Sequence, residues 1–263
     1  MVAAVSDRRS QAAVLFLVGA MALYLGGSDA ALAYVKAGLQ PLLLISGMVL
    51  VGLAVAAALW SRRDHDDVEQ SGDGRGHQLH GPRVAWLLAL PPLALVLIAP
   101  PALGAFAASR QPTRPPPTRQ TVPTDQGAAG VDQALFPPLI PPGDGAAVPL
   151  TLAEYMVRAH EAPHTLADLR IRLVGFVTPQ EPGGDGYLLT RFAINCCAAD
   201  ATALKVAIHG DPVPRAPDTW LEVEGRWQQR TSDDPSSEIP LLLSESIRVV
   251  TQPSPPYENG FPF

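Results

Sequence analysis

The residues best suited to chemistry lie in one short stretch, Arg191 to Asp200. It holds both cysteines of the 263-residue chain, Cys196 and Cys197, and they are adjacent. Neighbouring Cα atoms are about 3.8 Å apart, whereas an ordinary disulfide joins Cα atoms about 4.4 to 6.8 Å apart, so a simple structural bridge is disfavoured. Thiolates, carboxylates and imidazoles all bind zinc. Candidate metal ligands are therefore Cys196, Cys197 and Asp200, with His209 from a later strand.

The path of the backbone decides what the two thiols can do. If a strand continues through them, Cys196 shares the apolar face of Ile194 and Cys197 takes the opposite face. If the strand ends at Asn195 in a turn, both sulfurs can point the same way beside Asp200. Four interpretations stay open: a buried pair of small hydrophobic residues, a soft-metal or zinc site, a redox or intermolecular-disulfide site, and a strained vicinal disulfide.

Histidines offer weaker candidates. His160 and His164 have the i, i+4 spacing of a chelating pair on a helix, but Pro163 is expected to end that helix first, so we expect solvated side chains. His65, His77 and His80 lie among acidic residues in a hydrophilic loop, and their composition resembles that of metal-buffering loops. A solvated loop whose arginines fix the membrane topology is the simpler interpretation.

Arg191 has two predicted roles. It is expected to pair with Asp200 across the turn, and with Tyr187 and Trp220 it is expected to line a groove that binds a peptide or an oligosaccharide. The chain lacks a nucleophile elbow, a Walker motif, an ordered Ser/His/Asp set and a pair of catalytic carboxylates. We therefore predict no catalytic residues and no enzyme.

The charge balance argues against nucleic-acid binding. The formal net charge is −6, and residues 150–263 alone hold nine Lys/Arg against fifteen Asp/Glu, which also gives −6. Nucleic-acid-binding domains usually carry a basic surplus. An anionic polymer is therefore not expected as a partner.

Three apolar runs predict a membrane region over residues 1–108, with helices at about 11–31, 39–60 and 84–108. The first run also fits a signal peptide, but the second follows so closely that a membrane hairpin explains both. With the N-terminus inside, the inner segments carry six basic residues and the outer ones four. This bias predicts a multi-pass protein of the plasma membrane with an extracytoplasmic C-terminal domain.

Residues 109–149 form a proline-rich run with ten prolines and few large apolar side chains. Such a composition favours extended polyproline geometry and cannot bury a core. We expect a semi-rigid linker that holds the following domain away from the bilayer.

Residues 150–263 predict a soluble, all-β domain. Thr151 and Glu154 form a capping box for a short helix that ends near His160. Alternating apolar residues then predict five strands, at 169–178, 186–195, 203–209, 219–229 and 240–250. Five half-buried strands fit a closed barrel of the OB type, with Gly175 and Gly225 at sharp bends.

A family resemblance rests on four motifs: Cys196-Cys197-Ala198-Ala199-Asp200, Val174-Gly175-Phe176-Val177, the strand from Trp220 to Gly225, and Pro255-Pro256-Tyr257-Glu258. Together these resemble the YcgQ-like family of bacterial membrane proteins, and the segment from His80 to Trp86 resembles its actinobacterial branch. The resemblance implies a neighbouring gene for a predicted multi-span permease and, in some actinobacteria, a link to zinc-responsive regulation. It carries no catalytic residues.

These observations predict a membrane-anchored accessory subunit of a permease, with the lipid bilayer and the permease as partners. Its extracytoplasmic domain is expected to handle a metal, with zinc as the candidate cofactor. An envelope thiol-redox protein that uses Cys196 and Cys197 and a non-catalytic binding module are the alternatives.

Overall fold

The structure is a computed structural model. It describes residues 2–66, 94, 98, 101–112, 136–143, 145–180, 186–229 and 239–259. The chain divides into two compact units, Met1–Pro101 and Ala102–Phe263, and each is considered by itself. Most of the predicted third membrane helix lies outside the described residues, and so do His77 and His80 of the loop before it.

The first unit contains a pair of antiparallel helices, α1 (Val2–Gly26) and α2 (Gln40–Asp66), joined through 3-10 turns at Asp29–Ala33 and Ala37–Leu39. Glycines let the two backbones approach closely. A Cβ atom on Gly47 would lie 2.9 Å from Leu23 Cγ and 3.0 Å from the carbonyl oxygen of Gly19. Small residues at helix contacts are typical of membrane helices. The predicted helical hairpin is present.

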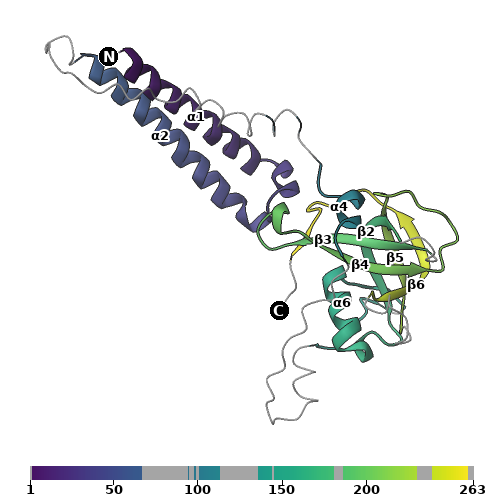
Figure 1. Ribbon diagram of the computed structural model, residues 1–263. Coiled ribbons are helices and arrows are strands. Elements are labelled where there is room, and N and C mark those ends of the chain that lie inside the picture. Colours follow the sequence, from purple (N-terminus) through teal and green to yellow (C-terminus); the bar gives the residue numbers. More distant parts are fainter. Residues whose placement is uncertain are drawn as a thin grey trace. The chain divides into compact units, whose positions relative to one another are not determined.

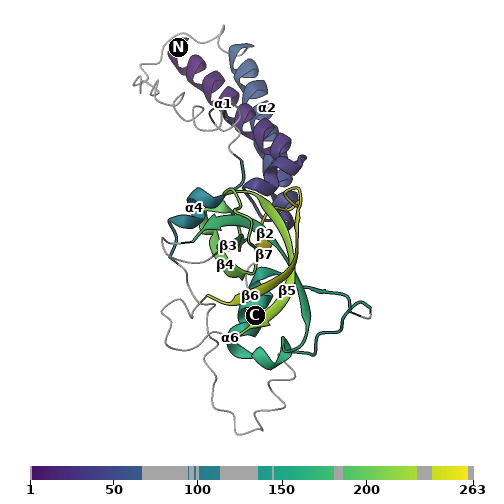
Figure 2. The same cartoon turned by 90° about the vertical axis from the view of Figure 1, so that its right-hand side faces the viewer.

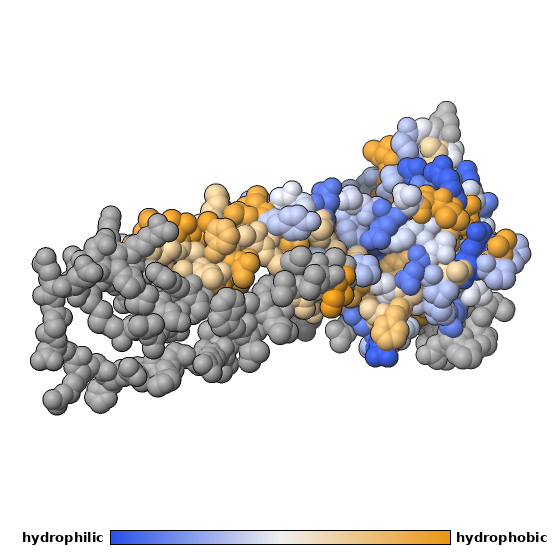
Figure 3. All heavy atoms as spheres, turned by 90° about the horizontal axis from the view of Figure 1, so that it is seen from above, coloured by the Kyte–Doolittle hydropathy of each residue, from blue (hydrophilic) through white to orange (hydrophobic). Residues whose placement is uncertain are grey.

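One helix within the described residues is long and apolar enough to cross a membrane, the 24-residue segment Ala37–Trp60. At 1.5 Å per residue it is about 36 Å long, which exceeds the hydrocarbon thickness of about 30 Å. The first predicted span corresponds to a shorter apolar stretch, Gln11–Gly26. Apolar side chains cover much of the visible helical surface (Figure 3), and those of Leu42, Met48 and Leu53 are more than half exposed.

The second unit is all-β apart from short helices. Its seven-stranded sheet has the order β1-β2-β5-β6-β4-β3-β7, and a further pairing of β2 with β3 closes a ring of five strands. Figures 1 and 2 show this ring from two sides. The strands are β1 (Val148–Pro149), β2 (Arg170–Pro179), β3 (Tyr187–Ile194), β4 (Thr202–His209), β5 (Trp220–Gln228), β6 (Leu241–Val249) and β7 (Glu258–Asn259). All five predicted strands are confirmed, each within one residue at either end.

Helix α6 (Leu152–Glu161) precedes the ring and contributes to its interior. The predicted cap is confirmed, because the N–H of Glu154 donates to the Thr151 hydroxyl at 3.1 Å. Tyr155 is fully buried, and its hydroxyl donates to the Leu241 carbonyl at 2.7 Å. The helix therefore fills space that side chains of the strands alone leave open.

Alternation along the strands produces the ring interior. Ile171, Leu173 and Val177 of β2 pack there against Leu204 and against other apolar residues of β4 and β5. Two glycines occur where backbones come very close. A Cβ on Gly175 would lie 2.7 Å from the Thr190 carbonyl oxygen, and one on Gly225 would collide with the Leu243 carbonyl at an irregularity in the β5–β6 pairing. The irregularity agrees with the predicted bend at Gly225, whereas the feature observed at Gly175 is the close approach of the β3 backbone.

A second apolar cluster lies outside the ring. Helix α4 (Ala105–Ser109) packs there on Phe176, Phe192 and Tyr257. Strand β3 is therefore buried on both faces, unlike the half-buried strand that its pattern predicted. The structure also begins the second unit at Ala102, within the predicted third span, whereas the sequence placed the start of the domain at residue 150.

Candidate metal site

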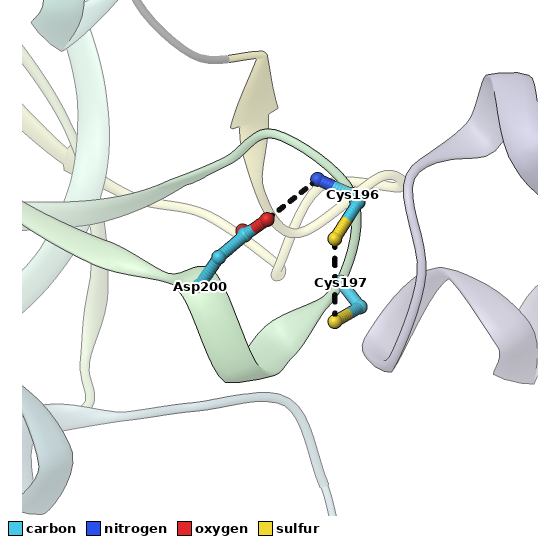
Figure 4. A group of neighbouring side chains, drawn as sticks. All are labelled: Cys196, Cys197 and Asp200. Carbon is cyan, nitrogen blue, oxygen red and sulfur yellow. Dashed lines mark hydrogen bonds between the residues drawn. The ribbon is translucent and has the colours of Figure 1, made fainter.

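A tight turn after β3 carries both cysteines. The strand ends at Ile194, a 3-10 turn spans Ala198–Asp200, and β4 begins at Thr202. The Asp200 carboxylate holds this turn together by accepting the N–H of Asn195 at 3.0 Å and the N–H of Cys196 at 2.8 Å. Figure 4 shows the carboxylate turned toward the Cys196 amide. The prediction that the strand ends at a turn is confirmed, and the continuous-strand alternative is wrong.

Both thiols are free, and their sulfur atoms lie 3.6 Å apart on the same side of the turn (Figure 4). Cys196 is exposed and Cys197 is half-buried. The interpretation as two buried hydrophobic residues is therefore wrong. The Asp200 carboxylate accepts the N–H groups of Asn195 and Cys196, and the turn that it stabilises leaves Cys196 exposed.

The electrostatics of the turn are dominated by Asp200. Hydrogen bonds from Cys196 and from the backbone lower the pKa of the Asp200 carboxyl. The same carboxylate, followed by the neighbouring Cys197, raises the pKa of the Cys196 thiol to about 11. At neutral pH the turn therefore combines an ionised carboxylate with a protonated thiol at Cys196, whereas reactive catalytic cysteines have lowered pKa values.

Cys196, Cys197 and Asp200 form a three-residue group whose potential ligand atoms all lie within 4.8 Å of one another. Tetrahedral zinc with bonds of about 2.3 Å to sulfur separates two thiolates by about 3.8 Å. The observed sulfur separation of 3.6 Å is close to that value. The sulfur spacing therefore fits a soft divalent cation, and the Asp200 carboxylate is a third donor nearby.

The structure does not bring His209 into this group. Strand β4 begins just after the turn, and His209 is its last residue. Extended residues advance about 3.3 Å each, which separates His209 from the turn by about 23 Å. The prediction failed because it placed His209 on a suitable face and ignored its position along the strand.

Arg191 pairs with a different carboxylate from the one expected. Its guanidinium lies 3.9 Å from Glu258 and donates to the carbonyls of Pro256 at 3.2 Å and Pro255 at 2.9 Å. Burial lowers the pKa of Arg191, and the charge of Glu258 partly offsets that shift. The predicted Arg191–Asp200 pair is wrong. The C-terminal segment pairs with β3 and places Glu258 beside the Arg191 guanidinium.

Glu258 is a structural residue that the sequence analysis did not identify. It is buried, and it accepts the N–H groups of Leu152 at 2.9 Å and Ala153 at 3.0 Å at the start of α6. Burial raises its pKa, although these donors and Arg191 act in the opposite direction. The sequence signal that could have identified Glu258 was its position in the motif Pro255-Pro256-Tyr257-Glu258.

The predicted groove of Tyr187, Trp220 and Arg191 is not formed as one surface. Arg191 lies over the Trp220 side chain at 5.7 Å, and Trp220 packs against the outer apolar cluster. Tyr187 lies at the other end of β3, where its buried side chain donates to Asp211 at 3.2 Å. Residues four apart on a strand are separated by about 13 Å, which divides the proposed groove.

His160 and His164 do not share a helix. Helix α6 ends at Glu161, and His164 lies in a 3-10 turn, Pro163–Thr165. The expected termination by Pro163 is confirmed. The side chains of the loop histidines, including His65 near the end of α2, are outside the described region.

Gln111 forms hydrogen bonds at and just after the end of the turn that carries both cysteines, residues 195–201, which we call the cysteine turn. Its side-chain amide donates to the Ala201 carbonyl at 3.0 Å and accepts from the Ala203 N–H at 2.8 Å. The Gln111 carbonyl accepts from the buried Lys205 ammonium at 2.7 Å. Sequence reasoning missed this residue because it lies in the proline-rich run, where the composition gave no sign of ordered contacts.

Comparison with curated proteins and with solved structures found no match. A comparison with protein-family models matched residues 151–258, which contain α6, the ring of five strands and the cysteine turn. That part of the chain matches the DUF1980 C-terminal domain, which supports its membership of a DUF1980-type family.

Proposed function

We propose that the protein is a membrane-anchored accessory subunit of a multi-span permease, and that its β domain presents a soft divalent cation such as zinc. The observation that carries this proposal is the convergence of Cys196, Cys197 and Asp200 on one accessible turn, with ligand atoms within 4.8 Å of one another. The metal is cargo in this proposal. The protein needs no catalytic residue.

The number of ligands supports an exchangeable site. Structural zinc sites are closed by four protein ligands, whereas open sites have three and leave one position for water or another molecule. Here three ligands are available and Cys196 is exposed. A donor from the permease then has room to take the fourth position during transfer.

The protonation state favours metal binding over thiol redox chemistry. The raised pKa of Cys196, about 11, makes its thiolate scarce at neutral pH, which slows attack on a disulfide. A divalent cation, by contrast, displaces the thiol proton, and the negative charge of the Asp200 carboxylate attracts it.

The finer fold assignment that we propose is an OB-type barrel. In chain order the five ring strands are β2, β3, β4, β5 and β6, and the closed ring runs β2-β3-β4-β6-β5 with β4 and β6 parallel. A five-stranded Greek-key barrel of this kind serves as a binding scaffold in many proteins. The acidic balance of residues 150–263 argues against an oligonucleotide ligand.

We further propose three membrane spans and an extracytoplasmic domain. The helix Ala37–Trp60 supports membrane association. The distribution of basic residues supports the sidedness. The resemblance to YcgQ-like proteins supports the permease as partner and the plasma membrane as location.

The test is a zinc titration of the full-length chain in detergent micelles against a chromophoric chelator. The variants are Cys196→Ser/Cys197→Ser and Asp200→Asn, with His209→Ala as the control. We expect one zinc per site in the wild type and in the control, loss of binding in the double variant, and affinity at least about 10-fold lower for Asp200→Asn. Equal binding by the wild type and the double variant rejects the proposal.

A binding module is the second candidate, favoured by a cavity of about 240 Å³ lined by His160, Pro163, Trp227 and Pro240 among others. Trp227 and the prolines offer flat surfaces on which a sugar ring or an extended peptide can stack. Trp227 fluorescence during titration with cell-wall oligosaccharides tests this role. A response that survives in the Cys196→Ser/Cys197→Ser variant separates it from metal binding.

A further inference from the structure

Residues 102–108, the end of the third apolar run, are bound to the β domain together with the three residues that follow, so the proposed third span ends before Ala102. The N–H of Leu103 donates to the Tyr257 hydroxyl at 2.9 Å, and the N–H of Ala105 donates to Asp218 at 2.5 Å. Gln111 adds its bonds to Ala201 and Ala203. Residues 102–111 are thus fixed along the outside of the ring.

Helix α4, within this segment, has two different faces. Ala105 and Ala108 are buried against Phe192 and its neighbours. Phe106 and Arg110 are on another face, where Phe106 is 71% exposed and the Arg110 guanidinium lies 4.1 Å from its ring centroid. An exposed phenylalanine ring beside a basic side chain, at the end of an apolar run, is suited to the boundary between lipid headgroups and acyl chains.

The cysteine turn belongs to the same part of the domain. Ala198 and Ala201, which flank Asp200, pack against the outer cluster that also holds α4. Gln111 bonds directly to Ala201. The segment that follows the predicted membrane region therefore contacts the turn that carries the candidate ligands, through the outer cluster and through Gln111.

We infer that α4 rests on the lipid bilayer through Phe106 and Arg110 and holds the cysteine turn close to the membrane surface. This inference rests on the proposed membrane anchoring and adds an orientation to it. Three residues separate Pro101 from Ala105, a distance of at most about 14 Å. The second unit begins at Ala102, before the proline-rich run, and residues 102–111 are bound within it.

An extended linker and docking through α4 predict very different distances between the β domain and the bilayer. An extended linker over residues 109–149 spans up to about 130 Å at about 3.1 Å per residue and places the whole domain far from the lipid. Docking through residues 102–111 keeps the cysteine turn near the headgroups and directs His209, at the far end of β4, away from them.

Energy transfer in nanodiscs tests this orientation. A Cys197→Ser variant of the full-length chain is labelled with a fluorescent donor at Cys196, and the disc contains lipids with an acceptor on the headgroup. The control carries the same donor on a cysteine introduced by His209→Cys in a Cys196→Ser/Cys197→Ser background. We expect higher transfer from position 196 than from position 209. Equal transfer or the reverse order overturns the inference.

A second pair of variants tests the contact itself. Phe106→Ala/Arg110→Ala alters side chains outside the packed cluster, and we expect it to lower the transfer from position 196. Leu243→Ala removes a partly exposed apolar side chain that is paired with His209 and should leave the transfer unchanged. Unchanged transfer in the α4 variant rejects the lipid contact. The measurements contain no metal, so failure of zinc binding does not affect them.

Discussion

An aspartate lies near each end of the β3–β4 pair, Asp211 at one end and Asp200 at the other. The two carboxylates differ in their partners. At one end, Asp211 accepts the Arg215 guanidinium at 2.8 Å, the Val213 N–H at 3.0 Å and the Tyr187 hydroxyl. At the other end, Asp200 accepts backbone N–H groups and neighbours two thiols, with no Lys or Arg ion pair among the described residues. A carboxylate already neutralised by arginine is structural, whereas one left without a cation is suited to bind one.

The pKa directions agree with this comparison. Burial alone pushes the pKa of Asp211 upward, but Arg215 and the N–H of Val213 outweigh it and leave a net decrease. Burial and then the charge of Asp211 raise the pKa of Tyr187. The lowered pKa of Asp200 arises without any basic residue, through the thiol and the backbone.

Glu258 provides the largest expected effect on stability. Glu258→Ala leaves the N–H groups of Leu152 and Ala153 without acceptors and the Arg191 charge poorly compensated in a buried place. We expect the free energy of unfolding to fall by about 3 to 5 kcal/mol. Chemical denaturation of the full-length chain, followed by tryptophan fluorescence, measures it. A loss below about 1 kcal/mol contradicts a structural role for this carboxylate.

Asp211→Asn tests the structural aspartate. The substitution removes the charge opposite Arg215 and weakens the bond to Tyr187, so we expect a loss of about 1 to 3 kcal/mol with unchanged zinc affinity. Asp200→Asn is the matched variant at the other end, where zinc affinity should change most. If the two substitutions have the same effects, the contrast between the two turns is wrong.

Ala199→Arg tests whether the missing cation is what leaves Asp200 available. Ala199 is exposed beside Asp200, and an arginine there supplies a positive charge like that of Arg215 at the opposite end. Repulsion between this charge and the metal should weaken zinc binding at least about tenfold, as measured by chelator competition. Ala199→Gln, of similar length but neutral, should bind as the wild type does.

The pH dependence of zinc binding tests the protonation state of the Cys196 thiol. With the pKa of Cys196 at about 11, binding must displace its proton throughout the neutral range. The apparent affinity should therefore rise about tenfold per pH unit between pH 6 and 8 for this one proton. Zinc competition at several pH values measures the slope. A flat profile indicates a thiolate that is already formed.

Local patterns in the sequence predicted most of the ring. The alternation in β5 and in the first half of β2 and the capping box at Thr151 depend on neighbours within a few residues, and the structure confirms them. The turn at Asn195 was one of two alternatives, and Asp200 decides between them through hydrogen bonds within five residues. Short-range physics was sufficient there.

Long-range packing accounts for the failures. Arg191 was assigned to Asp200, nine residues away, but its partner Glu258 comes from the C-terminal segment. Gln111 lies about ninety residues before the strand that it braces. A single sequence gives no signal for such pairs, because the residue types are ordinary and their proximity depends on how the whole ring closes.

The local character of the cysteine turn also bears on the coupling between metal and folding. All three candidate ligands come from the five residues Cys196 to Asp200, so closing the chain around an ion costs little loop entropy even before the ring has formed. Metal that binds the unfolded chain as well as the folded one stabilises the fold less than its affinity implies. The ion can therefore arrive and leave while the domain stays folded, unlike the ion in a zinc finger, which folds only with its metal.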